Sequence, residues 1–323
     1  MVAAFVAGGG YWIWQAADVP YRGFTEPELF VDVPVGARTA DIAGRLAAVG
    51  VVQDALVFRV AVRLADADRK LQAGEYRFTD AATPTQVIAR LVKGDSFMPS
   101  VTFPEGLTIG EMAGIFEKAG LGPAIDFVYA ADNLAMLVSD LDPKAKNLEG
   151  YLFPSKYTVS RKVGADGLVR AMVKEFRKAI GASGPPDGMT MRQWVTLASI
   201  VEKETGRPDE RPRVASVYRN RLKINMALQA DPTVIYAMML RHQWNGNIRK
   251  DDLDLDSPYN TYKYPGLPPG PIANPGKASL DAVRAPETTS YLYFVGRGDG
   301  SHAYAATLAE HNKNVREYQL KRR

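Results

Sequence analysis

Apolar and polar positions along residues 28–95 follow strand and helix periods in turn and predict one compact module. Leu29–Val33 and Ala73–Thr79 have the short, apolar-rich pattern of strands. Between them, apolar residues recur every three or four positions in the stretches 39–50 and 55–64, which predicts two helices with one buried face each. The pattern therefore predicts a β-α-α-β module, followed by one more helix that begins after Thr83.

The pattern changes after this module. Residues 96–147 are predicted as a connecting region that contains helices near 108–120 and 126–138. From residue 148 onward aromatic residues and prolines become denser, so we place a second domain at 148–323. The fold class predicted for the whole chain is α+β, with a small β-α-α-β module followed by a mixed α+β domain.

The first residues predict a membrane anchor at 1–20. The segment 1–17 carries no charge, and Tyr11, Trp12 and Trp14 cluster at one end, as aromatic residues do at a membrane interface. A helix that spans a bilayer needs about 20 apolar residues. The glycine run 8–10 weakens a helix, and no Lys or Arg precedes the segment, which favours a start recorded too far downstream. The alternatives are a cleaved signal peptide and a buried helix.

Composition narrows the chemistry. The net charge of +4 and the pI of about 9.0 come without a dense basic stripe, so no nucleic-acid partner is predicted. The chain has no cysteine, which excludes disulfides, thiol nucleophiles and cysteine-ligated metals. The three histidines, His242, His302 and His311, lack the spacing of metal ligands. No metal and no cofactor are predicted.

A predicted helix at 190–204 carries two glutamates near its end. Apolar residues surround almost its whole circumference, which indicates a buried helix. At 100° per residue, Glu202 and Glu204 point about 160° apart, so they cannot close on one bond as a pair. One of them can face a cleft while the other makes a structural contact. Arg219 and Arg221 on the next helix are candidates for ordinary ion pairs with Glu202 or Glu210.

Position along the helix favours Glu204 as the chemical group. It lies in the last turn, where the helix dipole disfavours a negative charge. This placement and partial burial both raise the pKa of a carboxyl group. A carboxyl that stays protonated near neutral pH suits a general acid for glycosidic bond cleavage. The alternative is a pair of surface glutamates on either side of Lys203.

Two later segments supply candidate ligand contacts. Asp231 fits the N-cap of a helix with Pro232 in its first turn, which explains it without a function. Gln229 lies just outside that helix, and its amide suits sugar hydroxyls and N-acetyl groups. The stretch 259–276 holds five prolines and three glycines among Tyr, Asn and Thr residues. It predicts a stiff loop that either faces a ligand or acts as a scaffold strap.

Eight segments, in order along the chain, carry a resemblance to a known family. They are Leu71–Phe78, Glu149–Pro154, Ala198–Thr205, Asn220–Leu222, Asp231–Tyr236, Tyr259–Tyr262, Gly266–Ile272 and Tyr291–Val295. Together they resemble the YceG-like family of endolytic murein (peptidoglycan) transglycosylases. Ala230 and Asn225 depart from the Thr and Gly usual in that family. The β-α-α-β layout of 28–95 resembles a LysM module, a small glycan-binding fold.

The resemblance implies an enzyme with Glu204 as its catalytic acid. Such an enzyme cleaves the β-1,4 bond between N-acetylmuramic acid and N-acetylglucosamine in nascent peptidoglycan strands, leaves a 1,6-anhydro end and terminates strands. In and beside the matched segments, residue type selects these side chains as candidates to bind the glycan: Glu149, Tyr151, Gln229, Asp231, Thr233, Tyr259, Asn260, Thr261, Tyr262 and Asn274.

The resemblance also implies a place in the cell. It implies a single-pass anchor in the bacterial inner membrane, a periplasmic catalytic domain, and peptidoglycan synthases (penicillin-binding proteins) as partners. Two alternatives stay open: a muramidase-type hydrolase that consumes water, and a non-catalytic scaffold that binds peptidoglycan.

Overall fold

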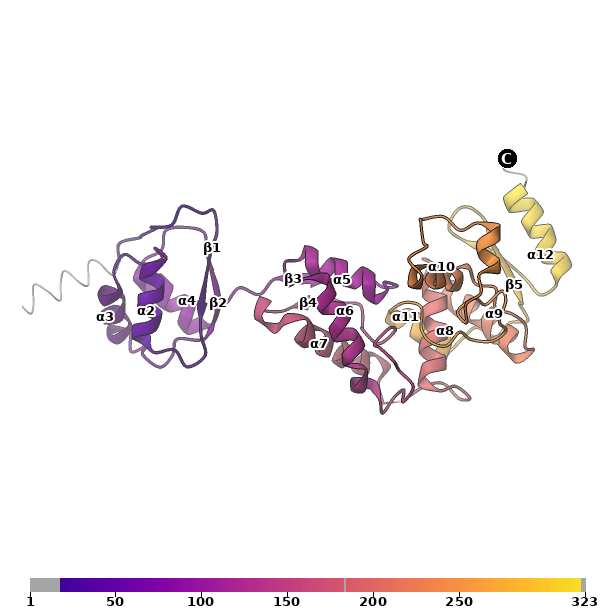
Figure 1. The fold of residues 1–323 in the computed structure, drawn as a ribbon, viewed down its shortest axis with the longest axis horizontal. Coiled ribbons are helices and arrows are strands. Elements are labelled where there is room, and N and C mark those ends of the chain that lie inside the picture. Colours follow the sequence, from indigo (N-terminus) through magenta and orange to yellow (C-terminus); the bar gives the residue numbers. More distant parts are fainter. Residues whose placement is uncertain (1–17, 183, 321–323) are drawn as a thin grey trace, which may run out of the picture. The chain divides into compact units, whose positions relative to one another are not determined.

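The computed structural model describes residues 18–182 and 184–320 of the 323-residue chain. Its internal contacts divide the chain into two compact units, one up to Pro99 with Thr158–Ser160, the other Ser100–Tyr157 with Arg161–Arg323 (Figure 1). Residues 1–17 of the predicted anchor lie outside the described residues. Within the described ranges, no helix combines the length and the apolar character that crossing a bilayer requires.

The first unit has the predicted order of strands and helices. Its two strands pair antiparallel, with Leu29 opposite Phe78 and Val33 opposite Gly74 (Figure 1). A third helix follows the second strand. The elements are β1 (Leu29–Val33), α2 (Thr39–Ala48), α3 (Ala55–Leu64), β2 (Gly74–Phe78) and α4 (Pro84–Lys93).

Local sequence signals explain these boundaries. The Asp54 carboxylate accepts hydrogen bonds from Leu56 N and Val57 N at 2.7 and 2.9 Å, which caps the start of α3. Thr83 and Gln86 form a capping box at the start of α4. Alternate residues of β2 face inward, so Tyr76 and Phe78 join the core of this unit with Leu46, Phe58 and Leu91.

The second unit is mostly helical. Its elements up to the central helix are β3 (Ser100–Thr102), α5 (Ile109–Lys118), α6 (Ala124–Asn133), η1 (Ala135–Val138), β4 (Lys156–Thr158), η2 (Arg161–Val163), α7 (Gly164–Ile180) and α8 (Met191–Glu204). After it come α9 (Arg211–Lys223), α10 (Asp231–Leu240), η3 (Lys250–Asp254), α11 (Lys277–Arg284), β5 (Tyr293–Gly296), β6 (His302–Ala305), α12 (Leu308–Val315) and η4 (Arg316–Leu320).

The predicted connecting region 96–147 lies largely within this second unit. Its helices α5 and α6 pack through Phe116 and Phe127, whose ring centroids are 5.4 Å apart. The helix predicted for 126–138 ends early, and a short 3₁₀ turn follows it. The Asn133 side chain donates to the Tyr129 carbonyl at 2.8 Å, and such side-chain bonds compete with a continuing helix.

Helix α8 is the central element of the second unit (Figure 1). Every residue from Trp194 to Val201 is buried, as the apolar circumference predicts. Thr190 and Gln193 form the predicted capping box, and Trp194 Nε1 donates to the Leu280 carbonyl of α11 at 2.9 Å. The helix ends at Glu204, because Thr205 already has an extended backbone. This end agrees with the predicted range 190–204.

Candidate active site

Glu204 opens onto a cavity of about 370 Å³, here called the Glu204 cavity. The last turn of α8 places Glu204 in one wall, and Tyr218 and Arg221 from α9 lie beside it. Gln229, Asp231 and Tyr262 form a second polar wall of the lining. Residues of the β5–β6 hairpin and α12 complete it, among them Phe294, His302 and His311.

The surroundings of Glu204 keep its carboxyl partly protonated near neutral pH. Burial raises the pKa of Glu204 to about 7. The Tyr218 hydroxyl donates to Glu204 Oε1 at 2.6 Å and opposes this rise, because it stabilises the ionised form. Negative Asp231 raises the pKa further and positive Arg221 lowers it. The carboxyl can therefore both give and take a proton at neutral pH.

The other glutamate of the helix has a structural role. Glu202 accepts from Arg211 Nη2 at 2.8 Å and from Gly276 N at 2.9 Å. Its side chain is only 5% exposed. The two glutamates point to different surroundings, as the helix geometry predicts. Only Glu204 of the two lines the Glu204 cavity.

The predicted partners of Glu202 were wrong, since Arg211 pairs with it. Arg221 is buried, and its guanidinium donates to the carbonyls of Leu292 and Leu228, both at 2.6 Å. Burial lowers the pKa of Arg221. These bonds join α9 to the segments on either side of the Glu204 cavity, so Arg221 acts as a brace with a charge directed towards the site.

Three of the candidate glycan contacts lie together in the Glu204 cavity. The Tyr262 hydroxyl donates to Asp231 Oδ1 at 2.5 Å. Asp231 does not cap α10 as expected: Ala230 occupies the N-cap position, and its side chain makes no capping bond. Gln229 has a backbone φ of 49°, and its N donates to the Thr261 carbonyl at 3.1 Å, which holds this residue at the cavity edge.

Three further candidates lie beneath that wall. Thr233, Asn260 and Thr261 are at most 1% exposed. Asn260 Nδ2 donates to the carbonyls of Leu253 and Leu255, both at 2.8 Å, and Asn260 Oδ1 accepts from Tyr262 N at 2.9 Å. The hydroxyls of Thr233 and Thr261 are 2.9 Å apart and bond to each other. The structure uses these side chains to shape the loop that carries Tyr262, and buries them away from the cavity surface.

The remaining candidates form a second cluster. Glu149 accepts hydrogen bonds from Ile109 N at 3.2 Å, from Asn274 Nδ2 at 2.8 Å and from the Tyr236 hydroxyl at 3.3 Å. Burial raises the pKa of Glu149 to about 8. Asn274 Oδ1 accepts from the backbone N of Gly150 and Leu152, both at 2.9 Å. Glu149 and Asn274 therefore join α5 to the segment after residue 148.

Tyr151 and Tyr259 belong to this second cluster. The Tyr151 hydroxyl donates to Asp142 Oδ2 at 2.7 Å. Tyr151, Tyr259 and Glu149 line a separate cavity of about 340 Å³, and Glu204 is not part of its lining. The structure thus divides the ten candidate contacts into an open group beside Glu204, a buried layer under it, and this second cluster.

Tyr218 was missed by the sequence analysis. It is 1% exposed and packs edge-on against Phe294 at 5.9 Å between ring centroids. A tyrosine on the buried side of α9, in the helix that follows the glutamate helix, was the available signal. Within the described residues, no group of three His, Asp or Glu side chains is arranged to hold a metal ion.

Comparison with known proteins extends over nearly the whole chain. Residues 31–317 match the sequence profile of the YceG-like family. An endolytic murein transglycosylase of Bacillus subtilis (strain 168) is 30% identical over 331 residues, which cover 97% of this chain and 91% of that protein. An endolytic murein transglycosylase of Streptococcus pneumoniae serotype 2 is 27% identical over 350 residues. That match covers 98% of this chain but only 63% of the pneumococcal protein.

A solved structure shows the same fold. The 2.6 Å crystal structure of a yceG-like protein from Listeria monocytogenes is 31% identical, with a TM-score of 0.59. The match covers 90% of this chain and 99% of that one.

Proposed function

The chain belongs to the YceG-like family, and on that basis we propose that it is an endolytic lytic transglycosylase of peptidoglycan with Glu204 as its general acid and base. One observation carries the proposal. The Glu204 carboxyl lies at the end of a buried helix, opens onto a cavity and has a pKa raised to about 7. The name of the Bacillus relative supports the substrate class.

The first chemical step needs Glu204 protonated. Its proton passes to the bridging oxygen of the β-1,4 bond between N-acetylmuramic acid and N-acetylglucosamine. The C1–O bond then breaks, and positive charge develops at the muramoyl C1 and ring oxygen. Negative Asp231, which lines the same cavity, is of the sign that stabilises this charge.

The second step uses the ionised form. Glu204 accepts the proton of the C6 hydroxyl of the same muramoyl sugar, and O6 bonds to C1 to close a 1,6-anhydro ring. Glu204 ends protonated as it began, and no water is consumed. The Tyr218 hydroxyl, 2.6 Å from Glu204 Oε1, stabilises the carboxylate between the two steps. General acid–base catalysis of this kind contributes roughly 10²- to 10⁴-fold.

The second polar wall of the Glu204 cavity supplies the glycan contacts in this proposal. Gln229 and Asp231 are exposed at the cavity, and Tyr262 is half-buried there with a flat ring for a sugar face. Thr233, Asn260 and Thr261 hold that wall in place. The second cluster supports the stretch 259–276 and shapes the neighbouring cavity. Its members are Glu149, Tyr151, Tyr259 and Asn274.

Three further parts of the proposal concern the first unit, the segment 1–20 and the effect of the cut on glycan strands. The β-α-α-β order of the first unit is that of a LysM module, and we assign it to glycan binding. The apolar segment at 1–20 is assigned to a single-pass anchor in the bacterial inner membrane, which leaves both units in the periplasm. The enzyme would act beside peptidoglycan synthases. There, an endolytic cut that leaves an anhydro end would terminate a new glycan strand.

A hydrolase is the second candidate, and one feature favours it. Asp231 gives the Glu204 cavity a second carboxylate, which ordinary glycosidases need as nucleophile or water-activating base. The products separate the two reactions, because a hydrolase adds one water to each cut and leaves reducing ends.

Digestion of purified peptidoglycan tests the proposal. The wild-type protein should release anhydro-ended fragments, and Glu204→Gln should bind glycan but release none. Glu175→Gln on α7 is the matched control, because Glu175 forms a surface ion pair with Lys178 and does not line the Glu204 cavity. Reducing-end fragments would establish the hydrolase, and binding without release by the wild type would establish a scaffold. A fully active Glu204→Gln protein would exclude Glu204 from the mechanism.

A further inference from the structure

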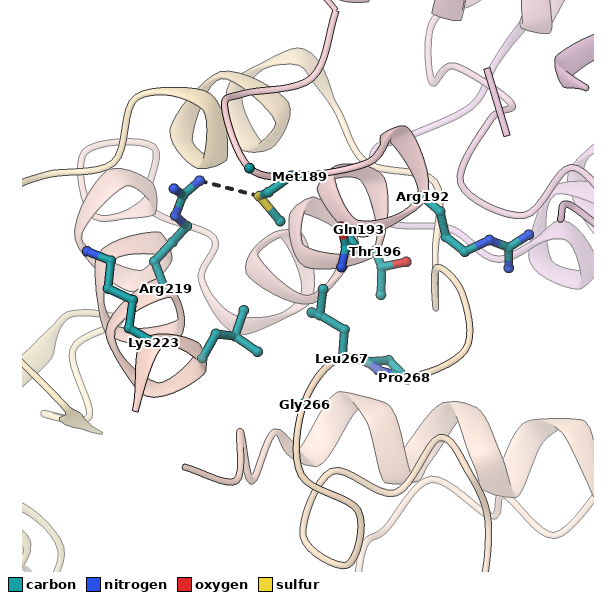
Figure 2. A pocket seen from close by; sticks show the side chains of 11 residues that line it. Met189, Arg192, Gln193, Thr196, Arg219, Lys223, Gly266, Leu267 and Pro268 are labelled. Carbon is teal, nitrogen blue, oxygen red and sulfur yellow. Dashed lines mark hydrogen bonds between the residues drawn. The ribbon is translucent and has the colours of Figure 1, made fainter. Parts of the chain in front are cut away.

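A second hollow lies on the same pair of helices, away from Glu204. It has a volume of about 590 Å³, larger than the Glu204 cavity, and lies between the first turns of α8, the last turns of α9 and the loop 266–268 (Figure 2). We call it the α8–α9 pocket. Its volume is within the range of about 300–1,000 Å³ typical of small-molecule sites.

Two positive charges in this pocket have no negative partner. Arg219 and Lys223 lie one turn apart on α9 and line the same side (Figure 2). The guanidinium of Arg219 contacts only Met189 Sδ, at 3.3 Å, and Lys223 makes no hydrogen bond or ion pair within the described chain. Among the described residues that line the pocket there is no carboxylate. Like charges at this helical spacing repel each other, and a bound anion would relieve that repulsion.

The third cation of the lining is already occupied. Arg192 Nε donates to Asp142 Oδ1 at 3.1 Å, and Arg192 Nη1 donates to the Pro269 carbonyl at 2.7 Å. Figure 2 shows its guanidinium directed away from the side chains of the pocket. The free positive charge therefore comes from Arg219 and Lys223.

A buried hydroxyl points to a ligand independently of these charges. Thr196 is 0% exposed, lines the pocket, and its Oγ1 has no hydrogen-bond partner in the structure (Figure 2). Buried polar atoms are nearly always hydrogen-bonded, so an orphaned one needs an explanation. Because this oxygen is itself buried, rotation of the Thr196 side chain towards the pocket would bring it to an oxygen of a ligand there, which would satisfy it.

Apart from Gln193, the rest of the lining is apolar. Met189, Leu267 and Pro268 contribute hydrocarbon and thioether surface (Figure 2). Leu222 also lines the pocket. The ligand that fits all three features is an organic anion whose charged end meets Arg219 and Lys223 and whose small apolar groups contact these walls. A guanidinium matches a carboxylate in geometry as well as in charge.

We propose that the α8–α9 pocket binds the terminal carboxylate and small apolar side chains of a short peptide. The assignment of this peptide to the peptide part of peptidoglycan rests on the proposed function. The pocket is a hollow rather than a flat face, which favours a peptide end over a lipid surface. From Thr196 to Glu204 is about 12 Å along α8, a distance that about four extended residues cover.

Direct binding tests the pocket without catalysis. The full chain carrying Glu204→Gln is titrated with fluorescein-labelled tri-alanine, in its L and D forms, with the C-terminus free or amidated. A free carboxylate should bind at least tenfold more tightly than the amide, as expected for charged hydrogen bonds. Adding Arg219→Gln with Lys223→Gln should remove that difference, and adding Thr196→Val should weaken binding several-fold.

Two variants control for charge and folding. Arg170→Gln removes one exposed positive charge from α7 and should leave binding unchanged. Arg219→Lys keeps the charge but loses the guanidinium geometry, so its affinity should lie between those of the wild type and Arg219→Gln. Equal binding of acid and amide in both peptide forms, or full binding by the Arg219→Gln and Lys223→Gln protein, would overturn the proposal.

Other sources of an anion are separate arms of the experiment. Inorganic phosphate that displaces the peptide at equal concentration would show a simple anion site and contradict the peptide assignment. Phosphatidylglycerol vesicles that bind through Arg219 and Lys223, when no peptide does, would show a membrane contact instead.

Digestion connects the pocket to the proposed function. The protein with Glu204 intact should cut peptidoglycan that carries its peptides faster than glycan stripped of them, and Arg219→Gln with Lys223→Gln should abolish that preference. An unchanged preference would contradict the peptidoglycan assignment. If the wild type cuts neither substrate, the proposed function fails, whereas the binding titration still decides the pocket.

Discussion

Two buried carboxyl groups of the second unit, Glu204 and Glu149, both have pKa values raised by burial, to about 7 and about 8. Their surroundings differ. Glu149 accepts hydrogen bonds from a backbone N–H, an amide and a phenol. Glu204 accepts one, from Tyr218, and opens onto a cavity lined by exposed polar side chains.

On the proposed mechanism, the difference separates a structural acid from a catalytic one. The carboxyl oxygens of Glu149 accept hydrogen bonds from groups 40 to 125 residues away in sequence, and these bonds hold distant segments together. Glu204 keeps capacity free for a substrate. A raised pKa alone therefore does not identify a catalytic carboxyl, and the number of internal donors and the access to solvent complete the assignment.

The largest expected effect concerns stability at Glu149. Its pKa rises from 4.5 to about 8 on folding, so its favourable contribution is complete below pH 4.5 and is lost as pH rises towards 8. By pH 7 this loss amounts to about 3 kcal/mol of the unfolding free energy. Urea unfolding at pH 5 and pH 7, followed by fluorescence of buried Trp194, should show a smaller pH dependence in Glu149→Gln. An identical dependence in Glu149→Gln and wild type would remove the contrast, and Glu175→Gln is the control.

The next effect concerns catalysis at Glu204. Glu204→Asp shortens the side chain by one methylene and withdraws the carboxyl from the bond it must protonate. A misplacement of about 1 Å costs roughly 100-fold in rate. Release of fragments from peptidoglycan measures the loss, and the urea midpoint at pH 7 should stay close to that of the wild type. A rate within a few-fold of the wild type would mean that Glu204 has no positional role.

Tyr218→Phe should move the pH profile in a direction that the structure fixes. The Tyr218 hydroxyl lowers the pKa of Glu204, so its removal raises that pKa. Because the acid acts in its protonated form, the alkaline limb of kcat/KM should move to higher pH. The limb is measured by initial rates of fragment release between pH 5 and pH 9. A limb that stays in place or moves down would show that Tyr218 does not interact with the reacting acid.

Asp231→Asn should shift the same limb the other way, and by less. Its negative charge raises the pKa of Glu204 as a secondary cause, so its removal lowers that pKa and moves the alkaline limb to lower pH. The same rate series measures the shift. Loss of all activity in Asp231→Asn, as complete as in Glu204→Gln, would instead favour the hydrolase, in which both carboxylates react.

Sequence reasoning was most successful where the chemistry is local, although the N-cap predicted at Asp231 was wrong. The caps formed by Asp54, Thr83, Thr108, Thr190 and Thr307 each depend on a partner two or three residues away, so the sequence pattern contains both members. The all-round burial of α8 followed from its apolar circumference in the same way.

It failed where partners are distant in sequence. Nothing near Glu202 identifies Arg211 as its partner instead of Arg219 or Arg221, because that choice depends on how α8 and α9 cross. The tyrosine-rich loop likewise shows suitable sugar-binding groups, but only the tertiary structure tells that Asn260 and Thr261 are buried and that Tyr262 reaches the Glu204 cavity.

The Asn274 amide has a consequence for how such chains can diverge. Its oxygen accepts from Gly150 N and Leu152 N, while its nitrogen donates to the Leu107 carbonyl and to Glu149. An aspartate there would lose both donors and set a second acid against Glu149, and an apolar residue would leave the N–H groups of Gly150 and Leu152 without their acceptor. The residues at positions 149 and 274 should therefore change together during evolution. A homologue with a substitution at one position should carry a compensating substitution at the other.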